Sequence, residues 1–345
     1  MASNPIFPDE IIIEILLKLP VKSILRCNTL SKHYYSLIHS QFFIRRHLNL
    51  VRLTNDFNDC SIVSPIGDPL LFNGRLRCFK RLQSSSSLVR NDIDELVISG
   101  PIDGLYCVID RHNVFRRCGL SIWNPATSEE FILPLIPLAN DKFEVRTIEE
   151  FFDDLCTREK CLAYGFGYDR DINNCKVVII YQPKSMSVMV DNMFMYIFNV
   201  SERTWKYHEE RFSMVKSWSM VSFAGVFVSG ACHWIRTFLK ESNPSICFCQ
   251  ILAFDMSTDS SRAISFPYVG DGYTWSKFTS IATLNGCLAL IDAVEEDVEG
   301  RCSSFNVWVM ADYGITKSWS KIHRISLTPT IIVDRFLGII GDRLL

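Results

Sequence analysis

Long apolar runs, a charge imbalance and targeting signals are all missing from this sequence of 345 residues. Its apolar stretches, such as Ile11–Leu17 and Ile331–Ile340, are interrupted or far shorter than the roughly 20 residues that cross a bilayer. With 36 Lys and Arg against 38 Asp and Glu, the net charge of −2 gives no electrostatic reason to bind nucleic acid or a membrane. Because the N-terminus does not resemble a signal peptide, we expect a cytosolic or nuclear protein with 13 reduced cysteines.

Motifs that indicate catalysis or metal binding are equally scarce. The sequence has no G-x-S-x-G, no H-E-x-x-H, no phosphate-binding loop and no dinucleotide fingerprint. Cys247 and Cys249 would share one face of a strand, and Cys232 adjoins His233, but no second pair completes a set of four ligands. We therefore expect no catalytic residue, no metal and no cofactor.

What the chain does have is a strongly amphipathic start. Pro8 suits the first turn of a helix, and apolar residues then recur with helical spacing as far as Leu19. Pro20 ends that helix and begins a second one. Ser31 is a candidate N-cap for a third helix, and residues 41–48 predict a short, basic fourth one.

Such a unit of roughly 40 residues is below the size that normally buries its own apolar surface. No cysteine framework or metal motif holds it together. Two alternatives follow. The helices dock on the rest of the chain, which composition alone favours, or another protein covers their apolar face.

Residues 7–43 resemble an F-box, because many positions match in fixed register, from F-P-D-E-I-I at Phe7 to L-S-K-x-Y at Leu30. The resemblance implies an F-box over residues 1–48 that binds the Skp-type adaptor, and through it the cullin, of an SCF ubiquitin ligase. The contact residues that it implies are Pro8, Ile11, Ile15, Leu16, Leu19, Pro20, Leu25, Tyr34 and Leu37. The family usually has tryptophan where Tyr34 stands, and a tyrosine keeps the ring but adds a hydroxyl that needs a partner or water.

From about Val51 the pattern changes to short apolar runs separated by Gly, Pro, Asn and Asp, which predicts an all-β region. A strand, a polar turn and a second strand recur around Asn124, Asn199, Asp255 and Val309, at intervals of roughly 50 to 75 residues. This recurrence predicts a β-propeller over residues 49–345 rather than a large sandwich. We expect about six blades, the last of them incomplete, because the final RFLGIIGDRLL has the pattern of an opening strand.

The same region is similar to the kelch-like F-box-associated domain of plant F-box proteins. The similarity rests on Asp103-Gly104-Leu105, on the run from Trp123 to Thr127, on YGFGYD at Tyr164 and on the tail VWVMADYGITKSW. That tail is especially similar to the S-locus F-box group. The resemblance implies a self-incompatibility role with basic, secreted S-ribonucleases as targets.

Together these patterns predict a substrate-recognition subunit of an SCF ligase, in which the propeller presents loops to a target protein. Acidic stretches are the candidate target-binding residues: Glu149, Glu150, Asp153, Asp154, Glu295, Glu296 and Asp297. Two other hypotheses stay open. One is a propeller enzyme with a central pocket, because this fold also carries hydrolases and oxidases, and the other is a scaffold that works without an SCF ligase.

Overall fold

The computed structural model describes most of the chain. The described residues are 7–54, 60–62, 70–73, 78–81, 96–110, 119–137, 162–181, 192–211, 215–220, 224–240, 243–267, 279–296, 302–326, 339–340 and 343–344. Within these ranges, no helix combines the length and the apolar character that a membrane span requires.

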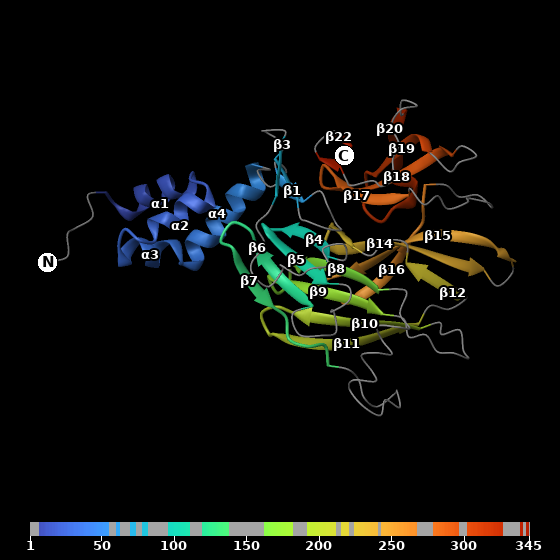
Figure 1. The fold of residues 1–345 in the computed structure, drawn as a ribbon, viewed down its shortest axis with the longest axis horizontal. Coiled ribbons are helices and arrows are strands. Elements are labelled where there is room, and N and C mark those ends of the chain that lie inside the picture. Colours follow the sequence, from blue (N-terminus) through green and yellow to red (C-terminus); the bar gives the residue numbers. More distant parts are fainter. Residues whose placement is uncertain are drawn as a thin grey trace.

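Four helices begin the chain and form a bundle at one end of the molecule (Figure 1). They are α1 (Asp9–Leu17), α2 (Val21–Cys27), α3 (Lys32–Ile38) and α4 (Gln41–Thr54). Pro8 and Pro20 directly precede α1 and α2, and the Tyr34 amide donates to Ser31 Oγ at 3.2 Å, so the predicted cap of α3 is confirmed. The core of the bundle contains Ile12, Leu16, Leu17, Ile24, Ile38 and Phe43.

The fourth helix is longer than the sequence pattern predicted. We expected it to end at Leu48, but α4 continues to Thr54, so the predicted domain limit at residue 48 falls inside a helix. Residues 49–54 contain neither Gly nor Pro, and nothing in them stops a helix that has already formed. The first strand begins only at Cys60.

All other regular elements of the described residues are strands, except for the short helix η3 (Thr316–Ser318). The strands are β1 (Cys60–Ile62), β2 (Leu70–Asn73), β3 (Cys78–Arg81), β4 (Leu96–Ile102), β5 (Leu105–Asp110), β6 (Leu120–Asn124), β7 (Glu129–Ile132), β8 (Leu162–Asp169), β9 (Asn174–Tyr181), β10 (Asn192–Asn199), β11 (Thr204–Arg211), β12 (Val215–Met220), β13 (Val226–Val228), β14 (Ala231–Lys240), β15 (Asn243–Asp255), β16 (Ser260–Ile264), β17 (Ser280–Leu284), β18 (Cys287–Glu296), β19 (Cys302–Met310), β20 (Trp319–Ser326), β21 (Ile339–Ile340) and β22 (Arg343–Leu344).

These strands confirm the predicted propeller. Blade 1 (β4–β7), blade 2 (β8–β11), blade 3 (β12–β16) and blade 4 (β17–β20) are antiparallel sheets in which each strand pairs with the next along the chain, except that β12 and β13 both pair with β14. β1–β3 form a smaller sheet, and β21 pairs with β22 in the segment predicted as an opening strand. The total of about six blades stays a prediction.

The recurrence seen in the sequence corresponds to two kinds of turn. In the first kind, an Asn or Asp ends a strand, its side chain accepts backbone N–H groups of the turn, and the fourth residue after it has a positive φ. The pairs are Asn124 and Ser128, Asp169 and Asn173, Asn199 and Arg203, and Asp255 and Asp259. In the second kind, two residues of positive φ join the strands, as in Asp103-Gly104, Ser229-Gly230 and Asn285-Gly286.

Neighbouring blades share their apolar cores, because successive residues of a strand point to opposite faces. In β9, Val177 and Ile179 belong to a cluster with residues of blade 1, whereas Val178 and Ile180 belong to a cluster with residues of blade 3. A third cluster joins blades 3 and 4. Each blade in the middle of this series is therefore buried on both faces.

Blades 2 and 3 approach closely at two glycines beside Trp234, Gly165 and Gly225. The Gly225 amide donates to the Tyr164 carbonyl at 2.6 Å, and Trp234 Nε1 donates to the same carbonyl at 2.8 Å. Ser99 Oγ of blade 1 donates to the Gly225 carbonyl at 3.3 Å. Trp234 is fully buried in the cluster between blades 2 and 3, beside the Gly225 backbone that blade 1 contacts through Ser99.

We expect Gly165→Ala to destabilise the propeller by roughly 2–3 kcal/mol, because the added Cβ would lie 2.6 Å from Cζ2 of the enclosed Trp234 ring. Urea unfolding measures the loss. The control is Gly286→Asn, where nothing lies within 4 Å and asparagine tolerates a φ of 76°. Equal stability losses in the two variants would contradict this account of the glycine.

Candidate functional site

An apolar strip on α1 is the most exposed apolar feature of the bundle's first helix. Phe7, Ile11 and Ile15 are 55%, 46% and 54% exposed. A spacing of four residues places Ile11 and Ile15 on one side of α1, and Phe7 lies two residues before its first residue. The side chains of Ile12 and Leu16, one position further along, belong to the core. We call Phe7, Ile11 and Ile15 the α1 strip.

The nine predicted adaptor contacts fall into three groups. The exposed contacts are Pro8, Ile11, Ile15 and Pro20. The half-buried contacts are Leu19, Leu25, Tyr34 and Leu37, and three of them (Leu19, Tyr34 and Leu37) pack against the bundle core. Leu16 is different, because only 3% of it is exposed and it packs among the core residues. The sequence prediction that Leu16 offers contact surface is therefore corrected. It is a core residue, one helical position from the strip.

Tyr34, the departure from the usual tryptophan, lies on α3 with its side chain partly buried against the core. Its ring lies edge-on to His33, with 6.2 Å between the ring centroids. His33 in turn places Nε2 2.8 Å from Asp9 Oδ1 and so links α3 to the start of α1. The tyrosine is thus an integral part of the bundle, and its effect on adaptor binding stays a prediction.

α4 is also linked to α1 by an ion pair, between Arg46 and Glu14. Both this pair and the one between His33 and Asp9 lie among exposed side chains, where an ion pair contributes at most about 1 kcal/mol. They orient the helices, while the apolar core supplies most of the stability.

The strands that the structure describes do not cover the α1 strip. Figure 1 shows α1, α2 and α3 standing apart from all the sheets, and only α4 reaches toward them. Because the described strands leave the strip open, the first alternative from the sequence, in which the helices dock on the rest of the chain, is not supported. The strip is available to another protein.

Only two of the seven acidic candidates for target binding lie among the described residues. Glu149, Glu150, Asp153, Asp154 and Asp297 lie outside the described residues. Glu295 and Glu296 end β18 and pair with Ser304 and Cys302 of β19, with a register shift between them. The second acidic stretch therefore begins within a strand.

A buried ion network that sequence reasoning missed ties blade 2 to blade 3. Lys176 Nζ lies 2.8 Å from Asp169 Oδ2, 2.9 Å from Asp259 Oδ1 and 2.6 Å from the Met256 carbonyl. Burial would raise the pKa of Asp169, but hydrogen bonds from Lys176, the Ile172 amide and Ser257 outweigh it and hold that pKa below its ordinary value. With every charge paired, the network is structural, and no side chain in it is left to react.

A second buried polar group surrounds His233, which has no exposed surface. Its Nδ1 lies 3.0 Å from the Val226 carbonyl and its Nε2 lies 2.7 Å from the Tyr313 hydroxyl. The Arg262 guanidinium carbon lies 4.7 Å from the centroid of the Tyr313 ring. Burial lowers the pKa of His233 to about 4, and the charge of Arg262 lowers it as well. The neutral ring therefore joins blade 3 to the turn after β19.

These observations bear on the hypothesis of a propeller enzyme. Within the described ranges, no group of three or more His, Cys, Asp or Glu side chains is placed to hold a metal ion. Trp234 packs between blades 2 and 3, and its Nε1 donates to the Tyr164 carbonyl, so this buried aromatic residue serves the packing of the blades. The hypothesis of a propeller enzyme stays a prediction.

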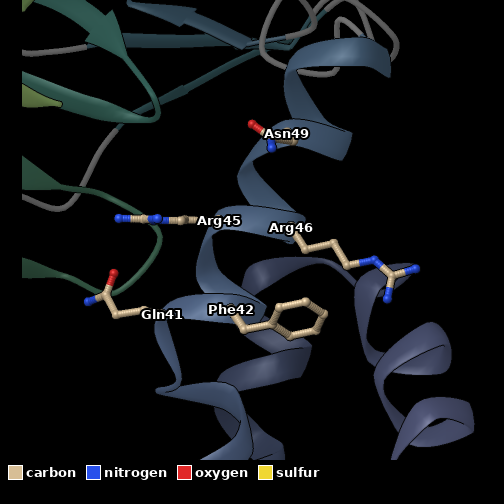
Figure 2. Close-up of a pocket in the computed structure, with 5 residues that line it drawn as sticks. All are labelled: Gln41, Phe42, Arg45, Arg46 and Asn49. Carbon is tan, nitrogen blue, oxygen red and sulfur yellow. The ribbon is translucent and has the colours of Figure 1, made fainter. Parts of the chain in front are cut away.

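Two surface residues escaped the sequence prediction. Phe42 and Arg45 of α4 line a hollow with Gln41, Arg46 and Asn49 (Figure 2). The helical spacing of these five positions was visible in the sequence, but the pattern did not reveal that Phe42 would be exposed while its neighbour Phe43 is buried.

Comparison with known proteins gives two family matches. The model of the F-box domain matches residues 5–46, and the model of the F-box associated beta propeller domain matches residues 79–338. The first match covers α1, α2, α3 and the start of α4, and the second covers every strand from β4 to β20.

Individual proteins are more distant. F-box protein CPR1 of Arabidopsis thaliana is 26% identical, with 91% of this chain and 72% of that protein aligned. An F-box/kelch-repeat protein of the same plant is 27% identical over 91% of this chain and 78% of its own length. Among solved structures, the WD40 domain of SCAP from fission yeast has a TM-score of 0.34 and 13% identity, covering 78% of this chain and 49% of that one. Similarity that loose carries no functional information.

The buried histidine predicts a loss of stability in acid. The unfolded chain binds a proton at His233 near pH 6.5, whereas the folded protein binds it only near pH 4. The free energy of unfolding that depends on a neutral His233 is therefore fully present above pH 6.5 and is lost as the pH falls toward 4. The loss amounts to roughly 3 kcal/mol in all. Urea unfolding between pH 7 and pH 4.5 should show a shallower slope for His233→Gln than for the wild type. Equal slopes would contradict this.

Proposed function

Because this chain belongs to the family of proteins that join an F-box to an F-box-associated β-propeller domain, we propose that it is the substrate-recognition subunit of an SCF-type ubiquitin ligase. In this role the helical bundle binds a Skp-type adaptor, and the adaptor links it to a cullin. The propeller holds the target protein. We also propose that the protein works in the cytosol or nucleus, where such ligases act.

The observation that carries the proposal is the exposed α1 strip. Ile11, Ile15 and Phe7 are about half exposed in the free chain, so part of their apolar surface stays in contact with water, which is unfavourable. Completing the burial of each isoleucine would contribute roughly 1 kcal/mol, because full burial of such a side chain is worth about 1.5–3 kcal/mol. A helix of the partner packed along the strip, beside Pro8 and Pro20, would gain this energy.

The chemistry of such a subunit is proximity. F-box proteins are generally non-catalytic, and the reaction is carried out by the ubiquitin-conjugating enzyme that the ligase recruits. Holding the target in the same complex raises the effective concentration of its lysines near that enzyme. The rigid, shared cores of the blades suit this task, because a target held by a stiff support samples fewer unproductive orientations.

The target itself is a narrower question. The S-ribonuclease hypothesis rests on the resemblance of the tail to S-locus F-box proteins, and neither relative described above is named for that role. The hypothesis therefore stays a prediction.

The docking surface is tested by Ile11→Asp combined with Ile15→Asp. We expect the pair to weaken binding to a purified Skp-type adaptor at least about tenfold, because two charges replace apolar contacts. The matched control is Ile44→Asp on α4, since Ile44 is 46% exposed, as Ile11 is. Calorimetry measures the affinity, and circular dichroism verifies the fold.

Leu16→Asp serves as a second reference, because a charge in the bundle core should unfold the helices and abolish binding through the loss of structure. Binding that survives in folded Ile11→Asp/Ile15→Asp protein would show that the adaptor does not use the α1 strip.

The target is tested by proximity labelling of cells treated with a proteasome inhibitor. A substrate-recognition subunit should label proteins whose abundance rises with the inhibitor, and the Ile11→Asp/Ile15→Asp variant should label them without that rise. If no ribonuclease is among them in pistil tissue, the self-incompatibility hypothesis is wrong.

A further inference from the structure

The hollow on α4 has a composition unlike that of the α1 strip. Its five side chains, Gln41, Phe42, Arg45, Arg46 and Asn49, fall at positions i, i+1, i+4, i+5 and i+8, which lie along one side of a helix. Figure 2 shows them spread along two turns of α4. The hollow thus combines one aromatic ring, two guanidinium groups and two amides.

The two arginines of this hollow differ in whether their charge is paired. Arg46 is paired with Glu14, and its guanidinium carbon lies 5.9 Å from the centroid of the Phe42 ring. Arg45 has no hydrogen bond or ion pair with any residue that the structure describes. The Phe42 ring is 61% exposed. An unpaired guanidinium beside an exposed ring favours a ligand that carries both a carboxylate and an apolar group.

The wider surroundings have the same sign of charge. Residues 7–54 contain seven Lys or Arg and three Asp or Glu, a net charge of +4, although the whole chain has a net charge of −2. An acidic segment would therefore be attracted to the bundle from a distance, and a basic one repelled.

The orientation of the hollow distinguishes it from the adaptor surface. The hollow lies between two rows of side chains: in Figure 2, Phe42 and Arg46 spread toward the other helices, and Gln41 and Arg45 spread toward the strands of the propeller. Asn49 lies beyond residue 46, at which the F-box match ends. The free charge of the hollow thus faces the part of the chain that holds the target.

We propose that the α4 hollow binds an acidic segment of the target protein, with a carboxylate on Arg45 and an apolar side chain against Phe42. This inference rests on the proposed function, since it assumes that the propeller holds a target. It adds a second contact, on the F-box side, to the recognition surface. Recognition then needs a target that presents an acidic, partly apolar segment at a fixed distance from its propeller-binding region.

The probe is a fluorescein-labelled peptide of twelve glutamates and aspartates with one central phenylalanine, measured by fluorescence anisotropy at low salt. The full chain is used both free and in complex with the adaptor. We expect binding in both states, with Arg45→Glu weakening it about tenfold and Phe42→Ala about threefold. A peptide with lysines in place of the acids should not bind.

The matched control is Arg26→Glu on α2, which changes the net charge of the bundle by the same amount as Arg45→Glu but lies outside the hollow. Equal weakening by both variants would overturn the proposal, because it would reflect general attraction rather than a site. Absence of peptide binding would overturn it as well.

Loss of binding on adaptor addition would also overturn the proposal, because the adaptor would then be the occupant of the hollow. Adaptor binding tests the proposed function independently of the hollow. If the free chain does not bind the adaptor, the proposed function is wrong, and peptide binding to the free chain still decides whether the hollow is a site.

Discussion

The close approach of blades 2 and 3 around Trp234 is the constraint on which this part of the propeller depends. The indole donates to the Tyr164 carbonyl, which also accepts from the Gly225 amide, so one carbonyl fixes two elements of blade 3 against β8. This geometry exists only because Gly165 and Gly225 leave room for the ring. Because the faces of the middle blades are buried against each other, sequence changes that do not disturb packing are confined to the rims and the connections between strands.

The sequence predicted features that depend on neighbouring residues. The cap at Ser31 and the turns at Asn124 and Asn199 each follow from groups a few positions apart, and all are present. The recurrence of a strand, a polar turn and a second strand correctly predicted the propeller, because the described blades repeat this short-range pattern. The fourth recurrence, around Val309, differs slightly, since β19 ends at Met310.

Features that depend on residues far apart in the chain could not be predicted from local sequence patterns. Asp259 reaches Lys176 across 83 positions, and no local pattern marks that pair. The burial of Leu16 beside the exposed Ile15 is decided by the side on which the other helices pack. The end of α4 was misjudged because Val51 and Leu53 suit a strand as well as a helix, and the preceding helical turns decided between them.

The sharing of apolar cores between blades has a consequence for how the protein fails. Val177 packs against one neighbouring blade and Val178 against the other. If the blade between them opened alone, it would expose the apolar cores of both neighbours. The sheets should therefore melt together rather than one after another. A damaging substitution anywhere in this series would then remove the whole receptor from the cell through quality control, and its targets would accumulate as if the gene were lost.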